Sequence, residues 1–243
     1  MKIYLIRHGE TECNKDRKFY GHLDVPLDDN GRAQAESLGM NIKDELVKDG
    51  VEISALYSSP LTRAMSTAAP VSDALSLHIQ KDAGLMEMNM GEWEGKSVDQ
   101  IINIKDKDGL PLMFKCMRKP LSYPMPGGEK LQDADKRITS TLDDIISHHL
   151  PAENIACVTH GGVIAVVLCH ILGKSLDDFR QNIVDNTSIT VIETDSDLAH
   201  AKLVKKNDTS HLAQEGLAEK SAVSRRAHPR RARKADTSDS AKS

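Results

Sequence analysis

Hydrophobic residues alternate along this chain between short continuous runs and longer stretches of helical spacing. The short runs contain β-branched or aromatic residues and are bounded by polar ones, as is typical of buried strands. They lie at residues 2–6, 55–57, 155–158, 188–193 and 201–204. The stretches with helical spacing lie at residues 29–47, 131–145 and 163–172. This alternation predicts an α/β fold, a three-layer α/β/α sandwich around a mostly parallel central sheet.

Serines and prolines predict where the helix after the second strand begins and ends. Ser58 and Ser59 follow that strand and are followed in turn by Pro60. We expect the helix to start there, because serine is a good N-cap and proline is tolerated in the first turn. Pro70 lies further along and predicts a kink or an end of the helix.

Two segments show no sustained period. Residues 14–30 contain scattered Gly, Pro, Asp and Asn, which indicates a loop. Residues 84–128 are rich in Met, Gly and Pro, and we expect mostly irregular structure there with one helix near residues 97–105.

The apolar pattern ends near residue 212. Residues 221–243 consist largely of Ala, Ser, Arg and Lys, so they lack the apolar surface that would offset the entropy of ordering. We therefore expect one domain over residues 1–212 and a disordered basic tail over 213–243. The whole chain carries a net charge of −4, yet the segment from Lys205 onward holds ten Lys and Arg against five Asp and Glu. The acidic domain is a poor nucleic-acid surface. Only the tail could bind nucleic acid or an anionic surface, and a functionless extension is the alternative.

Cysteine usage and the N-terminus bear on the compartment. The four cysteines have neither metal-site spacing nor the density of a disulfide scaffold. The N-terminus reaches Arg7 too early for a secretory signal, and no apolar run is long enough for a membrane span. A reduced, cytoplasmic protein is the expectation.

Two of the predicted strands end in the same way. The first runs into Arg7 and His8, and the strand at 155–158 runs into Thr159 and His160, each histidine being followed by glycine. Ligand sites in α/β proteins lie beyond the carboxyl ends of parallel strands. If these two strands are neighbours, the two imidazoles face each other at such a site.

An anion is the ligand that these residue types favour. Arg7 and Arg63 offer guanidinium groups that match phosphate, and the helix after Gly161 would direct its free N–H groups to the same place. The alternative is a zinc site at the histidines. Zinc requires a third ligand and disfavours adjacent cations, so phosphate is the better hypothesis.

Five blocks, in this order, resemble the motifs of a known family. They are LIRHGETECN at 5–14, GHLDVPL at 21–27, SSPLTRA at 58–64, LMEMNMGEWEG at 85–95 and VTHGG at 158–162. With NDTSHL at 207–212, they make the chain similar to the histidine phosphatase superfamily, the phosphoglycerate mutase-like proteins, from residue 1 to about 212. Tyr20 departs from the pattern, because many relatives carry Gln or Ser there, and we expect it to alter substrate choice.

The resemblance implies a role for each candidate residue. His8 would be the nucleophile that accepts the phosphoryl group, while Arg7, Arg63 and His160 would hold the phosphoryl oxygens. Glu87 would donate a proton to the leaving oxygen and then activate water. The expected substrate and phosphate site comprises Arg7, Asn14, Tyr20, Gly21, Arg63, His160 and Gly161. Neither a cofactor nor a metal is expected.

The segment after Glu87 favours one branch of the family. Mutases of sugar phosphates carry a longer insert there with an Arg-Arg pair, of which Arg118 and Lys119 are only a loose echo. The block around Glu87 is more similar to the α-ribazole and broad-specificity phosphatases. We therefore expect a metal-independent phosphomonoesterase that acts on a small phosphorylated metabolite. A cofactor-dependent phosphoglycerate mutase and a catalytically silent binding module of the same fold are the alternatives.

Overall fold

The computed structural model describes residues 1–48 and 50–213. Its centre is a six-stranded sheet with the order β3-β2-β4-β1-β5-β6. The strands are β1 (Lys2–Arg7), β2 (Ile53–Ser58), β3 (Ile79–Lys81), β4 (Asn154–Thr159), β5 (Ile189–Glu193) and β6 (Lys202–Asp208). The first four strands are parallel to one another, whereas β5 is antiparallel to both of its neighbours. The predicted strands and the mostly parallel sheet are confirmed.

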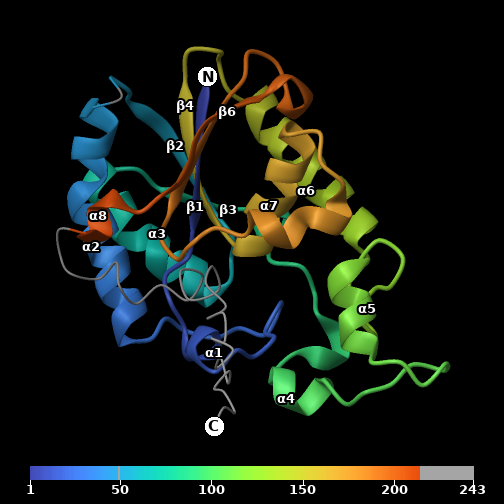
Figure 1. Ribbon diagram of the computed structural model, residues 1–243. Helices are drawn as coiled ribbons and strands as arrows, with labels where there is room; N and C mark the ends of the chain where they lie inside the picture. The colour runs from blue at the N-terminus through green and yellow to red at the C-terminus, as the bar shows by residue number, and fades with distance from the viewer. Residues whose placement is uncertain (49, 214–243) are drawn as a thin grey trace, which may run out of the picture.

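Helices cover both faces of this sheet. The α-helices are α1 (Glu12–Lys15), α2 (Asp29–Lys48), α3 (Thr62–Leu75), α4 (Val98–Ile101), α5 (Leu112–Arg118), α6 (Leu131–Ser147), α7 (Gly161–Ile171) and α8 (Ser210–Ala213). Four short 3₁₀ turns are η1 (Ala83–Leu85), η2 (Gly91–Trp93), η3 (Leu176–Asn182) and η4 (Leu198–His200). Figure 1 shows α2 and α3 on one face and α6 and α7 on the other. The three-layer prediction is thereby confirmed.

Side-chain alternation along β1 explains the two layers. Ile3 and Leu5 belong to the apolar cluster under α6 and α7, and Tyr4 and Ile6 belong to the cluster under α2 and α3. Successive residues of a strand point to opposite faces, so a run of apolar residues buries both. The helical stripe predicted over residues 131–145 is likewise buried, as part of α6.

The start of α3 differs from the prediction. The helix begins at Thr62 rather than at Ser58 to Pro60, and no serine caps it. Asp24, distant in sequence, accepts hydrogen bonds from the backbone N–H and the hydroxyl of Thr62, each at 2.7 Å. Sequence pattern does not reveal this cap because it comes from another segment of the chain.

Pro70 does not end its helix, which was one of the two outcomes predicted for this residue. The helix α3 continues through it to Leu75. Gly39 of α2 lies against Pro70, so close that a Cβ at position 39 would be 2.7 Å from the proline Cβ. The packing of the two helices therefore holds the proline-containing turn in place.

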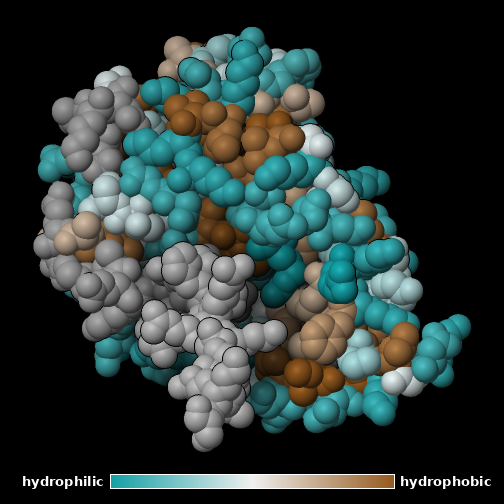
Figure 2. Space-filling view, viewed as in Figure 1, coloured by the Kyte–Doolittle hydropathy of each residue, from teal (hydrophilic) through white to brown (hydrophobic). Residues whose placement is uncertain are grey.

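The irregular segment 84–128 contains more structure than expected. The predicted helix near 97–105 is only the single turn α4, and α5 was missed. The loop expected over residues 14–30 contains the end of α1 and the start of α2. Leu110 and Phe114 are each 51% exposed, and Figure 2 shows an apolar area at the lower right, in the region of α4 and α5. Such an exposed face breaks the apolar period from which helices are predicted.

None of the helices in the described part of the chain has the length and apolar character that a membrane crossing requires. The four cysteines are free thiols. Ala213 is the last residue of α8. The rest of the predicted basic tail, from residue 214 on, lies outside the described residues.

Candidate active site

The two predicted histidines meet where β1 and β4 end. These strands are adjacent and parallel, with Arg7 paired to Thr159, so His8 and His160 follow at matching positions. Their ring centroids are 5.1 Å apart, and both residues are almost completely buried. The expectation that the two imidazoles face each other is therefore correct.

Hydrogen bonding determines which nitrogen of His8 is available. Its Nδ1 lies 2.7 Å from the carbonyl oxygen of Gly9, which can only accept, so Nδ1 carries the hydrogen. Burial, and then the charges of Arg63 and Arg7, hold the pKa of His8 well below its usual value. The ring is thus neutral near pH 7, with a lone pair on Nε2. A nitrogen with such a lone pair can act as a nucleophile.

His160 has a different environment. Its Nε2 lies 2.8 Å from the hydroxyl of Ser59, and its buried Nδ1 has no hydrogen-bond partner. Burial is the main cause that lowers its pKa well below the ordinary value, followed by the charges of Arg63, His8 and Arg7. Ser59, which the sequence suggested as a helix cap, contacts this histidine instead.

Arg7 and Arg63 are both buried and each is held by backbone carbonyls. Nη1 of Arg7 donates to the Val184 oxygen at 2.6 Å. Nη1 and Nη2 of Arg63 donate to the oxygens of Leu23 and Gly21, at 3.0 and 2.7 Å. In both residues the buried Nε–H has no partner. Each guanidinium is therefore held by the backbone and keeps a buried Nε–H that has no acceptor.

Glu87 lies at the start of α7. Its Oε1 accepts from the Met88 N–H and its Oε2 from the Gly162 N–H, each at 3.0 Å. The helix N-terminus had been expected to point its N–H groups at phosphate, but the Gly162 N–H is used to hold this carboxylate. A Cβ at position 162 would lie 2.3 Å from Oε1, so glycine is required for this approach.

The remaining predicted residues surround this centre. The Asn14 amide donates to the Tyr20 hydroxyl at 2.7 Å. The Arg63 guanidinium carbon is 4.7 Å from the centre of the Tyr20 ring, which is within cation–π range. Gly21 has a φ of +35°, and a Cβ there would lie 2.4 Å from a carboxylate oxygen of Glu94. Gly161 allows Arg7 to approach closely, since a Cβ added at position 161 would lie 3.2 Å from the Arg7 Nε.

A cleft of about 490 Å³ opens over these groups. Six of the predicted residues line it, namely Arg7, Asn14, Tyr20, Gly21, Glu87 and Gly161. His8, Arg63 and His160 are not among its lining residues and lie buried behind them. Sequence reasoning missed three basic residues that line it too: Arg17, Lys18 and Arg180. No motif marks them, because two lie in a loop and the third in η3. Arg118 and Lys119 line a separate cavity with Phe114.

His22 follows Gly21, one of the predicted site residues. Its Nδ1 lies 3.4 Å from the Asn89 amide nitrogen, and its Nε2 is buried without a partner. Within residues 1–48 and 50–213, no group of three or more His, Cys, Asp or Glu is placed to hold a metal ion. Donors for an anion thus dominate the site that the structure describes.

Comparison with known proteins places this geometry in context. The model of the histidine phosphatase superfamily (branch 1) matches residues 3–209. Phosphoglycerate mutase-like protein 4 from Arabidopsis thaliana is 36% identical over 164 residues, which is 67% of each chain. The structure of YhfR from Bacillus stearothermophilus is 32% identical with a TM-score of 0.75, covering 87% of this chain and 98% of that one. A mutant of phosphoserine phosphatase from Entamoeba histolytica, solved with phosphoserine, is 28% identical with a TM-score of 0.72 and the same two coverages.

These relatives agree with the geometry on the class of enzyme. The family match covers most of the chain, and relatives of known structure align along nearly their whole length. The chain is an enzyme of the phosphatase class, and the mutase-like relative keeps phosphoglycerate mutase as the alternative. It belongs to the histidine phosphatase superfamily, branch 1.

Proposed function

We propose that this protein hydrolyses a small phosphomonoester through a phosphohistidine on Nε2 of His8, without a metal ion. Glu87 donates the proton that the leaving group needs. Arg7, Arg63 and His160 bind the phosphoryl oxygens, assisted by Asn14. Tyr20 and Gly21 border the same cleft and contact the substrate beyond its phosphoryl group.

One observation carries this proposal. Three buried nitrogens beside His8 have no hydrogen-bond partner, namely Nε of Arg7, Nε of Arg63 and Nδ1 of His160. Buried donors are almost always satisfied in folded proteins, so a group of three that is unsatisfied indicates a missing acceptor. A phosphoryl group presents three oxygens to such a set.

The tautomer of His160 follows from this role. A lone pair on Nδ1 would repel a phosphoryl oxygen, so the hydrogen belongs on Nδ1 and the lone pair on Nε2. The Ser59 hydroxyl supports this assignment because it can donate to Nε2 across 2.8 Å. His160 then donates a hydrogen bond while neutral.

The reaction proceeds in two transfers. Nε2 of His8 attacks phosphorus, the bond from phosphorus to the ester oxygen breaks, and that oxygen takes the proton of Glu87. Glu87 then removes a proton from water, whose oxygen attacks phosphorus and releases phosphate from His8. Both steps move the same phosphoryl group between fixed cationic donors, which stabilise the charge of each transition state.

Hydrolysis is favoured over mutase activity by the open cleft. Arg118 and Lys119, the counterparts suggested for the basic pair of mutases, line another cavity and do not cap this cleft. Water therefore reaches the phosphohistidine. Phosphoserine and 3-phosphoglycerate are the first substrates to test, since Entamoeba phosphoserine phosphatase has been solved with each.

Phosphate release from 4-nitrophenyl phosphate, phosphoserine and 3-phosphoglycerate tests the proposal, with EDTA present. The wild type should turn over, and His8→Ala should lose at least ~10³-fold in kcat, because removing a nucleophile leaves only binding and electrostatic catalysis. The exposed His148→Ala is the matched control and should retain wild-type rates. Isomerisation of 3-phosphoglycerate without phosphate release would establish the mutase instead, and activity that survives in His8→Ala would refute the nucleophile.

A further inference from the structure

The cleft holds basic side chains that the phosphoryl group does not need. We propose that Arg17 and Arg180 bind a second anionic group of the substrate, so that the enzyme selects small phosphomonoesters that also carry a carboxylate or a second phosphate. This inference rests on the proposed phosphatase function of the same cleft. It assigns the choice of substrate to two residues outside the family motifs.

The size of the cleft leaves room for more than a phosphoryl group. Its volume of about 490 Å³ is many times the ~10–15 Å³ that a cavity needs to hold one water molecule. Of the proposed phosphate donors, Arg7 lines the cleft, and the fully buried Arg63 lies 4.7 Å from the ring of Tyr20, which lines it too. An organic group attached to the phosphate therefore extends into the part of the cleft that Arg17 and Arg180 line.

The charge of the lining selects the sign of that organic group. Four basic residues line the cleft, namely Arg7, Arg17, Lys18 and Arg180, and Glu87 is the single acidic residue among the described ones that do. A cleft with this balance attracts anionic groups. Arginine also matches carboxylate and phosphate with two parallel hydrogen bonds.

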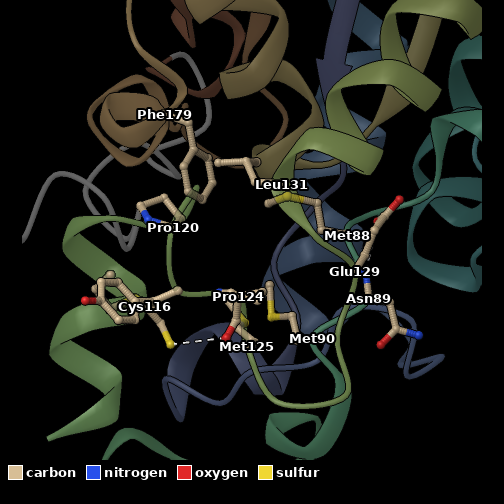
Figure 3. A pocket seen from close by; sticks show the side chains of 12 residues that line it. Met88, Asn89, Met90, Cys116, Pro120, Pro124, Met125, Glu129, Leu131 and Phe179 are labelled. Carbon is tan, nitrogen blue, oxygen red and sulfur yellow. Dashed lines mark hydrogen bonds between the residues drawn. The ribbon is translucent and has the colours of Figure 1, made fainter. Parts of the chain in front are cut away.

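Arg180 is fixed relative to the catalytic residues. Phe179, the preceding residue of η3, is buried beside Met88, the residue after Glu87, and Figure 3 shows its ring near Leu131 and Pro120 in this cluster. At the other end of η3, the chain continues to Val184, whose carbonyl holds Arg7. The position of Arg180 is thus tied to both the proton donor and the phosphate donors.

Arg17 comes from a separate segment, the turn after α1. Its φ is +53°, in the left-handed region, and its N–H donates to the Asn14 oxygen at 3.3 Å. The neighbouring Lys18 forms an ion pair of 2.8 Å with Asp16, so its charge is partly compensated. No carboxylate in the described part of the chain pairs with the Arg17 guanidinium, whose charge is available to a ligand.

Pairs of substrates that differ in one group test the inference. Phosphoserine carries a carboxylate that phosphoethanolamine lacks. In the second pair, 3-phosphoglycerate carries a carboxylate where glycerol 3-phosphate has an uncharged hydroxymethyl group. In Arg17→Gln and Arg180→Gln, KM for the carboxylate-bearing member should rise about tenfold, which corresponds to the loss of one charge-assisted hydrogen bond. The kcat, and the KM for the member without the carboxylate, should stay within about twofold. Propanediol bisphosphate in the same assay distinguishes a second phosphate from a carboxylate.

Arg118→Gln is the matched control, since it removes the same charge from a different cavity and should change neither member of a pair. Arg180→Lys keeps the positive charge but loses the planar guanidinium that can form two parallel hydrogen bonds, and it should give an intermediate KM. Equal KM changes for both members, or none in either variant, would overturn the inference while leaving the phosphatase intact. Absence of turnover in the wild type would instead refute the proposed function itself.

Discussion

At the scale of single residues, the two buried imidazoles differ in which nitrogen holds the hydrogen. A carbonyl oxygen beside Nδ1 of His8 leaves Nε2 with a lone pair, and a hydroxyl beside Nε2 of His160 allows Nδ1 to donate. The same residue type can therefore act as a nucleophile in one position and as a hydrogen-bond donor in the other. The partner of each ring, rather than its motif, sets this difference.

Ser59 is expected to be a positioning residue that acts through His160. In Ser59→Ala the buried Nε2 loses its partner, so the tautomer with hydrogen on Nδ1 is no longer favoured and kcat should fall about 10- to 100-fold. KM should change much less, and the acid limb of the pH profile of kcat should shift. Steady-state kinetics between pH 5 and 8 measure all three quantities.

Ser58→Ala serves as the control for this change. Ser58 is equally buried, but its hydroxyl donates to the Ser59 carbonyl at 3.0 Å and has no contact with an imidazole among its described hydrogen bonds. The variant should keep kcat within about threefold of the wild type. A similar loss in both serine variants would mean that packing, and not the hydrogen bond to His160, accounts for the effect.

At the scale of elements, contacts between segments override several local signals. Proline usually ends a helix because it lacks an N–H and its ring clashes with the preceding turn. In α3 the chain nevertheless remains helical through Pro70, and Gly39 of α2 provides the space for the ring. The cap of the same helix comes from Asp24, outside the helix and its flanks.

Gly39→Ala tests this packing by reversing an ordinary trend. Alanine in place of glycine inside a helix normally stabilises by about 1 kcal/mol. Here the new Cβ would lie 2.7 Å from Cβ and 2.8 Å from the oxygen of Pro70, so we expect destabilisation of about 1–3 kcal/mol in urea unfolding. Met40→Ala, at an exposed neighbouring position, should change stability by no more than ~0.5 kcal/mol. A gain in stability for the glycine variant would contradict the described packing.

At the scale of the whole molecule, the active site reduces stability in acid. Burial, followed by the charges of the arginines, lowers the pKa of both His8 and His160 below 6.5. Protons therefore bind the unfolded chain more readily than the folded one. The contribution of the two histidines to the free energy of unfolding is fully present above pH 6.5. It is lost as the pH falls from there toward their two folded-state pKa values.

Urea unfolding at pH 7 and pH 5.5 measures this effect. The two histidines together should remove about 2 kcal/mol of stability between these values, since each contributes up to ~1.4 kcal/mol per pH unit. The double variant His8→Asn with His160→Asn should lose much less over the same range, whereas the exposed His148→Asn should behave as the wild type does. His200, whose pKa Asp197 raises, is present in every variant and cancels from the comparison. An equal decrease in the double variant would show that other groups cause it.

Local pattern by itself predicted the longer strands and helices in their order, and the two histidines at strand ends, but it missed the short strand β3. These features depend on residues close in sequence, whose spacing reveals burial. The family resemblance also made Glu87 the candidate proton donor, a choice that no local pattern makes over Glu92 or Glu94. The short helix α5 escaped because its exposed Phe114 hides the helical period.

Only the tertiary structure decided how these pieces act together. It placed Ser59 on His160 and gave the Gly162 N–H to Glu87. In the folded chain Arg17 and Arg180 line the same cleft, whereas Arg118 lines a different cavity. Each of these facts joins residues far apart in the chain, and their meeting depends on how the helices and loops pack around the sheet. Spacing along the sequence encodes burial, but it does not encode which distant partner a buried polar group will find.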